Sequence, residues 1–253
     1  MTKSKYKVIG LVPARSGSKR IKNKNIKYLN GHPLIAYTIQ SAINSDLFSK
    51  VVCVTDCPEI AKIAIYYGAE VPVLRPNSTA TDLSPDIDWV IWILNYYISI
   101  GERYDIFSIL RPTSPFRLSS TIETAFKLFL SKSQIDSVRA VQKVREHPGK
   151  MWVINENQMF PLLPFKLNQV PWHSSQYANL PEIYIQNASL EIAYTKTVFE
   201  LNSISGNVIQ PYISTGLEGF DINNPEDWTL AEHYINSGEG KLTKIQLKPF
   251  NIL

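Results

Sequence analysis

Apolar runs alternate with amphipathic segments from residue 8 to residue 144, and this alternation is the strongest constraint on the fold. Short runs rich in β-branched residues predict buried strands, and apolar residues at helical spacing predict helices. Strands that alternate with helices form mostly parallel sheets, with right-handed crossovers and helices on both faces. The sequence therefore predicts an α/β fold of three layers. The predicted strands are 8–13, 50–56, 71–74, 104–110 and 137–144, and the predicted helices are 34–43, 58–67, 86–98 and 121–130.

The pattern changes between residues 149 and 181, where prolines, glycines and aromatic residues replace the periodic segments. Exposed Trp, Met and Phe side chains favour an interface, because apolar patches of that size are costly to leave in water. An ordinary surface excursion is the alternative. We expect one domain spanning residues 1–253, with 149–181 as an arm. Beyond the arm, strands are predicted at 189–194 and 208–213 and helices at 197–201 and 224–236.

The first predicted strand ends at Pro13 and leads into a loop of small and basic residues. Small residues let backbone N–H groups approach an anion closely, and cations supply the opposite charge. A strand followed by such a loop favours a polyphosphate site, whereas a solvated basic loop is the alternative. The glycine spacing does not match a Walker A loop. The cations of this segment are Arg15, Lys19, Arg20, Lys22, Lys24 and Lys27.

The net charge of +4 is modest and is partly accounted for by this loop, so it favours a small anionic ligand over nucleic acid. The two cysteines, Cys53 and Cys57, have neither the spacing of a redox pair nor a histidine cluster that would suit zinc. We expect both to be reduced, as in the cytosol. The N-terminus lacks a secretory pattern, and no apolar run approaches the roughly 18 residues of a membrane span. The sequence predicts a cytoplasmic protein that acts on neither nucleic acid nor membrane.

The opening loop resembles the P-A-R-x-G-S-K-x-x-x-x-K-N signature of the cytidylyltransferases that activate sialic acids and related 2-keto-3-deoxy sugars. The matching residues are Pro13, Ala14, Arg15, Gly17, Ser18, Lys19, Lys24 and Asn25. The resemblance implies a Rossmann-like fold of the nucleotide-diphospho-sugar transferase type, in a single nucleotidyltransferase domain that binds CTP. It implies catalytic roles for Arg15, Lys19 and Lys24, and nucleotide-binding roles for Ala14, Ser18 and Asn25.

The segment from Arg75 to Asp82 resembles the family's R-P-x-x-x-A-x-D loop, which lies against the nucleotide base. The resemblance implies that Arg75 donates to the acceptor edge of cytosine and that Asp82 is also a nucleotide-binding residue. For Arg75, an arginine stacked on the following proline in a turn is the alternative. In the family a D-x-D pair before the last helix holds the metal, and here the pair reads Asp221-Ile222-Asn223. The resemblance thus implies a Mg²⁺ site at Asp221 and Asn223, weakened because an amide replaces the second carboxylate.

The acceptor side of the resemblance is less complete. The turn at Arg111 resembles the family's L-Q-P-T-S-P, which contacts the acceptor sugar, with arginine in place of glutamine. Lys150 matches a family lysine near the sugar, and Asn187 is the retained asparagine of R-x-N-G-A. Two family arginines that face the acidic sugar are replaced by Tyr177 and Ile185. A carboxylate acceptor favours a bidentate arginine, so the usual sialic acid pocket is altered.

The leading hypothesis is a Mg²⁺-dependent cytidylyltransferase that joins CTP to a sialic-acid-like (nonulosonic or 2-keto-3-deoxy) sugar. The products would be a CMP-sugar, for surface glycans such as lipopolysaccharide or capsule, and pyrophosphate. In the family the arm at 149–181 reaches the other subunit of a dimer and closes over its active site, which implies a homodimer. One alternative is a sugar-1-phosphate nucleotidylyltransferase, in which Arg111 and Lys150 bind the phosphate. The other alternative is a catalytically weak nucleotide-binding relative of the family, which Asn223 favours.

Overall fold

The computed structural model describes residues 6–251, except for the side chain of Ala188. The chain divides into two compact units. The first comprises Met1–Ala140 and Asn187–Leu253, and the second comprises Val141–Gln186. The second unit contains the segment 149–181 that the sequence singles out as an arm. The two units are described separately below.

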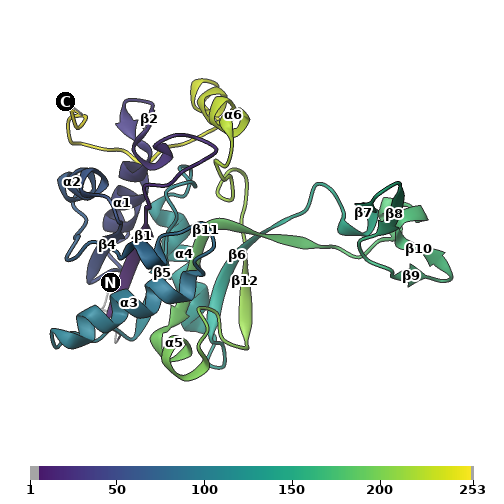
Figure 1. Ribbon diagram of the computed structural model, residues 1–253, viewed down its shortest axis with the longest axis horizontal. Coiled ribbons are helices and arrows are strands. Elements are labelled where there is room, and N and C mark those ends of the chain that lie inside the picture. The colour runs from purple at the N-terminus through teal and green to yellow at the C-terminus, as the bar shows by residue number, and fades with distance from the viewer. Residues whose placement is uncertain (1–5, 252–253) are drawn as a thin grey trace. The chain divides into compact units, whose positions relative to one another are not determined.

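The first unit is built on a six-stranded sheet with the order β12-β6-β11-β5-β1-β4 (Figure 1). β1 (Val8–Pro13) pairs in parallel with β4 (Lys50–Val54) on one side and with β5 (Ile106–Ile109) on the other. β11 (Tyr184–Tyr194) runs antiparallel to β5, with Glu191 opposite Ile109. The other two strands are β6 (Ser137–Lys143) and β12 (Ile209–Ile213). The sheet is therefore mixed: the parallel strands β5, β1 and β4 form one end of it, with β4 at the edge, and β11 runs antiparallel beside them.

Helices cover both faces of this sheet, which confirms the three-layer α/β fold. Alternate residues of β1 point to opposite faces, as the pleat of a strand requires. Val8 and Val12 pack with the helices of one face, and Ile9 and Leu11 pack with those of the other. The first face carries α1 (Leu34–Asn44), α2 (Pro58–Tyr66) and α4 (Ser119–Ser131), and the second carries α3 (Asp86–Ser99) and α5 (Thr195–Leu201).

A smaller apolar cluster holds the C-terminal helix α6 (Pro225–Asn236) against the end of the opening loop. Ile21 from the loop, Ile222 and Trp228 all contribute to it. A capping box starts α6, because Asn224 accepts from the Asp227 backbone N–H while the Asp227 carboxylate accepts from that of Asn224. This cluster fixes the position of the Asp221-Ile222-Asn223 segment relative to the loop.

The strand predicted at 71–74 is wrong. The chain makes an isolated bridge between Glu70 and Val52 and then continues without strand pairing. Pro72 has no N–H to donate to a neighbouring strand, so the apolar run cannot extend the sheet. The short pair of β2 (Tyr28–Leu29) and β3 (His32–Pro33) was not predicted, since two-residue strands have no readable period.

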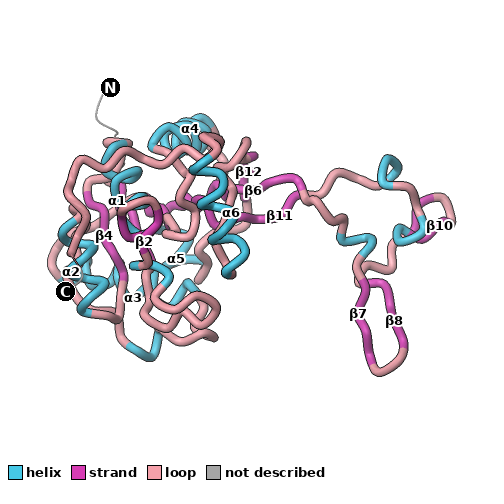
Figure 2. The backbone as a smooth tube through the Cα atoms, turned by 90° about the horizontal axis from the view of Figure 1, so that it is seen from above, coloured by secondary structure: helices cyan, strands magenta, loops and turns pink. Residues whose placement is uncertain are grey.

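The second unit contains two antiparallel pairs that the sequence did not predict (Figure 2). β7 (Trp152–Asn155) pairs with β8 (Gln158–Pro161), and β9 (Lys166–Leu167) pairs with β10 (Val170–Pro171). Many of its apolar side chains are exposed, among them Val153, Ile154, Met159, Phe160 and Phe165. None of the helices within residues 6–251 is long and apolar enough to cross a membrane.

Candidate active site

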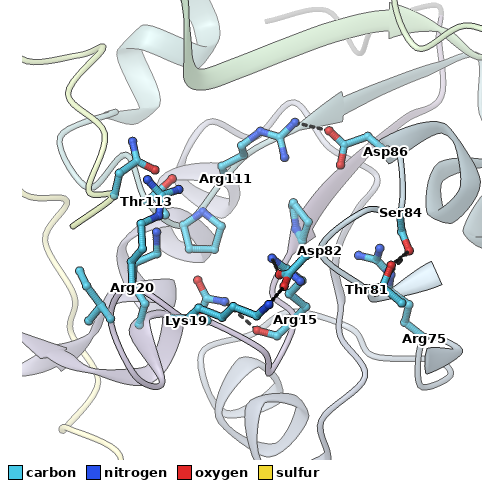
Figure 3. A pocket seen from close by; sticks show the side chains of 17 residues that line it. Arg15, Lys19, Arg20, Arg75, Thr81, Asp82, Ser84, Asp86, Arg111 and Thr113 are labelled. Carbon is cyan, nitrogen blue, oxygen red and sulfur yellow. Dashed lines mark hydrogen bonds and ion pairs between the residues drawn. The ribbon is translucent and has the colours of Figure 1, made fainter. Parts of the chain in front are cut away.

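A cavity of about 580 Å³ opens in the first unit beyond the carboxyl ends of β1 and β5. β1 has β4 on one side and β5 on the other, so the chain order reverses here, and such points are where open α/β sheets bind ligands. The carboxylates in its wall are Asp82 and Asp86. Its cations outnumber them, which suits a polyanion (Figure 3). These cations are Arg15, Lys19, Arg20, Lys24, Arg75 and Arg111.

The opening loop is anchored to the sheet where it begins, and its two ends are joined to each other. Asp56, just after β4, accepts from the backbone N–H of Ser16 at 2.8 Å and from its hydroxyl at 2.5 Å. The buried Asn25 amide donates to the Arg15 carbonyl at 3.2 Å and also lines the cavity, as does Ser18. Ala14 is buried and does not line the cavity; its N–H continues the β1 pairing by donating to Val54.

Two cations of the loop converge on Asp82. Arg15 Nη2 lies 2.6 Å from Asp82 Oδ1, and the Lys19 ammonium pairs with the other carboxylate oxygen. Hydrogen bonds from Lys19 and Arg15 hold the pKa of the Asp82 carboxyl below its usual range. This carboxylate therefore neutralises part of the positive charge of the loop. Lys22 does not line the cavity, and Lys27 lies instead over the Trp228 ring at 4.1 Å.

Arg75 is buried in the wall of the cavity, 6% exposed. Its guanidinium donates to the Thr79 hydroxyl at 3.3 Å and to the Thr79 carbonyl, and it lies 5.5 Å from the centre of the Trp89 ring. Burial lowers the pKa of Arg75, and the nearby carboxylates of Asp86 and Asp56 partly offset that effect. The side chain is thus positioned by the loop that follows it.

Arg111 belongs to a network of two arginines and two carboxylates. Its Nη2 lies 2.5 Å from Asp86 Oδ2 and 2.9 Å from Glu191 Oε1, while Arg139 Nη1 lies 2.7 Å from Glu191 Oε2. Burial opposes the charge of Arg111, but Glu191 and Asp86 outweigh it and raise the pKa of the guanidinium. The four formal charges cancel, so Arg111 brings no net positive charge to the cavity. Sequence reasoning missed Asp86, Glu191 and Arg139, which have no local motif.

Lys24 connects the loop to the segment before α6. Its ammonium donates to the Ile222 carbonyl at 2.7 Å, and the Ile222 N–H donates to the Thr113 carbonyl at 2.9 Å. Burial lowers the pKa of Lys24, and Asp221 partly offsets it. Asn223 lines the cavity and donates from its amide to Asp221 Oδ2 at 2.6 Å. The other oxygen, Asp221 Oδ1, is buried and has no hydrogen-bond partner within residues 6–251.

Two predicted sugar-binding residues have partners elsewhere. The Asn187 amide donates to the Ser214 hydroxyl at 3.0 Å and accepts from the Ser189 N–H at 3.1 Å, and Asn187 does not line the cavity. Lys150 lies in the second unit, where its ammonium donates to the carbonyls of His173, at 3.0 Å, and Ser175. The roles of both residues in sugar binding remain predictions.

Residues 9–147 match the Cytidylyltransferase family. The chain belongs to that family. It is 35% identical over 227 residues to CMP-N,N'-diacetyllegionaminic acid synthase of Legionella pneumophila, covering 89% of this chain and 95% of the relative. It is 32% identical over 225 residues to N-acylneuraminate cytidylyltransferase of Escherichia coli, covering 89% of this chain and 51% of the relative. The resemblance of the opening loop is thereby confirmed.

Solved structures show the same fold at low sequence identity. The structure of CMP:2-keto-3-deoxy-manno-octonic acid synthetase complexed with CTP aligns with a TM-score of 0.65 and 13% identity, covering 92% of this chain and 99% of that one. A 4-diphosphocytidyl-2C-methyl-D-erythritol synthase from Anaerococcus prevotii aligns with a TM-score of 0.62 and 11% identity, covering 91% of this chain and 99% of that one. These likenesses confirm the nucleotide-diphospho-sugar transferase type of the fold. The protein is a nucleotidyltransferase.

The cytidylyltransferase has oxygen atoms at the edge of the cavity that fit a divalent cation; Asn223 lines the cavity, whereas Asp221 does not. Asp221 Oδ1 is a buried carboxylate oxygen with no hydrogen-bond partner within residues 6–251, and the amide of Asn223 donates to the other oxygen of the same carboxylate, Oδ2. Within residues 6–251 there is no group of three or more His, Cys, Asp or Glu side chains that could hold a metal by themselves. Magnesium binds through one or two carboxylates together with phosphate oxygens and water, so this arrangement fits a cation that arrives with a nucleotide.

Proposed function

We propose that this cytidylyltransferase transfers CMP from CTP to a sialic-acid-like sugar of the nonulosonic or 2-keto-3-deoxy class, releasing pyrophosphate. The observation that carries the proposal is the cavity itself, where the cations of the opening loop adjoin the buried Arg75 on one side and the Thr113 turn on the other. The relatives named for CMP-activated nonulosonic acids support the substrate class. The product would serve surface glycan synthesis, and the reaction would take place in the cytoplasm, where CTP is made.

The triphosphate would lie against the opening loop. Arg15 and Lys19 would bind its oxygens in place of Asp82, with Ser18 and Asn25 beside them. Arg75 would donate to the acceptor edge of cytosine from its buried position. Nucleotidyl transfer depends mainly on positioning and on neutralising the polyphosphate, which these side chains do.

The reaction is a displacement at the α-phosphorus. An oxygen of the sugar hydroxyl forms a bond to this phosphorus, and the bond from the phosphorus to the bridging oxygen of the β-phosphate breaks. The electron pair of that bond leaves with pyrophosphate, and the hydroxyl proton passes to solvent. Lys24, held between the loop and Ile222, would stabilise the negative charge that develops on the leaving group.

We propose that Asp221 and Asn223 hold Mg²⁺ when the nucleotide binds, which makes the reaction Mg²⁺-dependent. The unpartnered Asp221 Oδ1 supports this assignment. The cation, when bound, neutralises phosphate charge. The Asn223 amide keeps an oxygen ligand but removes one negative charge, so the site should need phosphate oxygens to reach full affinity.

A homodimer is proposed from the apolar surface of the second unit. The side chains of Ile154 and Met159 pair across β7 and β8 and are 73% and 55% exposed. Contiguous apolar side chains of this kind typically mark an interaction site, and a second copy of the chain is the partner that the family resemblance implies.

The test is an assay of pyrophosphate release with each nucleoside triphosphate, Mg²⁺ and a panel of acceptors. The panel contains N,N'-diacetyllegionaminic acid, N-acetylneuraminic acid, a 2-keto-3-deoxy octonic acid and several sugar-1-phosphates. We expect release with CTP and a keto-sugar acid, with the CMP-sugar detected by mass spectrometry. Release with sugar-1-phosphates alone would contradict the proposal.

A sugar-1-phosphate nucleotidylyltransferase is the second candidate, because the replacement of two family arginines by Tyr177 and Ile185 favours a different acceptor. It would require Arg111 to bind the acceptor phosphate. Asp86 and Glu191 already neutralise that guanidinium, which makes it a poor receptor for a dianion. Binding of CTP without turnover of any acceptor would instead support a catalytically weak relative.

A further inference from the structure

The geometry points to Arg20 as the residue that binds the carboxylate of the acceptor sugar. Arg20 would thereby make the enzyme selective for acidic sugars. This inference rests on the proposed function, because it assigns a group to the acceptor that the proposed reaction requires. Arg20 matches no position of the signature to which a role was assigned. Three observations support the assignment: the guanidinium of Arg20 has no partner within residues 6–251, it lines the cavity, and the neighbouring cations are already paired.

Arg20 is the cation of the cavity that has no partner. Within residues 6–251 its guanidinium makes no hydrogen bond and no ion pair. Each of the other five cations is already bound. Arg15 and Lys19 pair with Asp82, Lys24 donates to Ile222, Arg75 donates to Thr79, and Arg111 pairs with Asp86 and Glu191. A free guanidinium can bind an incoming anion without first losing a protein partner.

Arg20 lies on the acceptor side of the cavity. Figure 3 shows its side chain beside Thr113, whereas Arg15 and Lys19 gather around Asp82. Three effects act on the pKa of the Lys24 ammonium: burial lowers it most, the Asp221 carboxylate raises it, and the positive charge of Arg20 lowers it. The Thr113 carbonyl in turn holds Ile222. Arg20 therefore adjoins the turn that faces the acceptor and lies away from the cations that converge on Asp82.

The charge balance leaves Arg20 as the group suited to a carboxylate. In the proposed function Arg15, Lys19 and Lys24 bind the triphosphate and offset its negative charge. Arg111 lies in a network whose charges cancel. A guanidinium binds a carboxylate through two parallel hydrogen bonds, which a lysine cannot reproduce. Arg20 thus supplies the bidentate partner that Tyr177 and Ile185 do not.

The experiment compares a sugar acid with its methyl ester. The probes are N,N'-diacetyllegionaminic acid, N-acetylneuraminic acid and the methyl ester of each, and initial rates give KM and kcat for the acid turned over fastest. Affinity for CTP is measured separately by calorimetry in the absence of sugar. The variants are Arg20→Gln, Arg20→Lys and the control Lys22→Gln, which removes a cation of the same loop that does not line the cavity.

We expect Arg20→Gln to raise KM for the acid by roughly 10- to 100-fold, since a hydrogen-bonded charge pair is lost. The preference for the acid over its ester should disappear, and the Kd of CTP should stay within about twofold of the wild-type value because the triphosphate has its own cations. Arg20→Lys should recover part of the loss, and Lys22→Gln should behave as wild type.

Two results would overturn the assignment of Arg20 alone. One is an active wild type whose Arg20→Gln variant keeps both KM for the acid and the preference over the ester. The other is an Arg20→Gln variant that weakens CTP binding while KM for the acid stays unchanged, which would place Arg20 on the triphosphate. A wild type that turns over no sugar acid would overturn the proposed function and this assignment together.

Discussion

At the residue scale, Asp82 organises two of the cations of the cavity. This exposed carboxylate pairs with Arg15 and Lys19, the two cations expected to bind the triphosphate. Each exposed pair is weak by itself, because water screens it. Together they still require an incoming anion to displace a carboxylate before it can use both cations.

Replacement of Asp82 by Asn should therefore tighten CTP binding a few-fold, because the amide cannot compete for the cations. Calorimetry at low ionic strength would measure the change, which should shrink as salt is added. Asp46→Asn, an exposed carboxylate that does not line the cavity, is the matched control. Weaker CTP binding in the Asp82 variant would mean that this carboxylate contacts the nucleotide directly.

Asp221 tests the metal assignment at the same scale. Asp221→Ala should lower kcat by at least about 100-fold, since it removes the carboxylate of the proposed Mg²⁺ site, whose Oδ1 is buried and has no hydrogen-bond partner within residues 6–251. The melting temperature should be nearly unchanged, and Glu226→Gln, an exposed carboxylate at the start of α6, should retain full activity. Full turnover by Asp221→Ala would exclude the assignment.

Asn223→Asp is the converse experiment. It restores a second carboxylate beside Asp221, and two adjacent carboxylates repel each other unless a cation lies between them. We expect half-maximal activity at a lower Mg²⁺ concentration than in the wild type. A titration of activity against Mg²⁺ would show it, and an unchanged midpoint would mean that Asn223 is not a ligand.

At the scale of elements, the charge network around Arg111 joins four parts of the first unit. Arg111 follows β5, Asp86 starts α3, Glu191 lies in β11 and Arg139 lies in β6. Glu191 is almost fully buried, with a side chain that is 4% exposed. The network therefore connects residues from four elements around the cavity, and the loss of one charge should destabilise the others.

Arg111→Gln, which restores the family residue, should lower the free energy of unfolding by no more than about 3–5 kcal/mol, because it leaves Glu191 with only Arg139. The double variant Arg111→Gln with Glu191→Gln should be more stable than Arg111→Gln alone, since the uncompensated buried charge is gone. Denaturant unfolding of the wild type, both single variants and the double variant would measure the coupling. Strict additivity would mean that the two side chains do not interact.

The sequence predicted elements well where a local pattern defines them. The alternation of strands and helices is set by periodic apolar residues, and Pro33, Pro58 and Pro225 mark helix starts. The prediction of a strand at 71–74 was wrong because its apolar residues suit a strand, whereas Pro72 has no N–H to donate to a neighbouring strand. The Arg111 network escaped prediction because its members lie far apart in the chain, and a single charged residue in a strand ordinarily indicates a solvent-facing position.

At the scale of the whole molecule, the second compact unit is too small to bury a substantial core of its own. Ile154 and Met159 face the same side of the β7–β8 hairpin and remain exposed. A variant with both residues changed to Asp should dissociate the proposed dimer while leaving the first unit folded. Light scattering after size exclusion would report the mass, with Asn157→Asp as the control. A dimer that survives the double change would contradict this interface.

The pairing of Asp82 with Arg15 and Lys19 also bears on how the protein behaves among the anions of a cell. Orthophosphate and nucleoside monophosphates are abundant there, and an open cluster of cations would retain them. A ligand with one phosphate cannot engage enough of the loop to replace the carboxylate, whereas a triphosphate reaches several cations at once. The built-in carboxylate thus selects for chain length among phosphates and keeps the site available for its substrate.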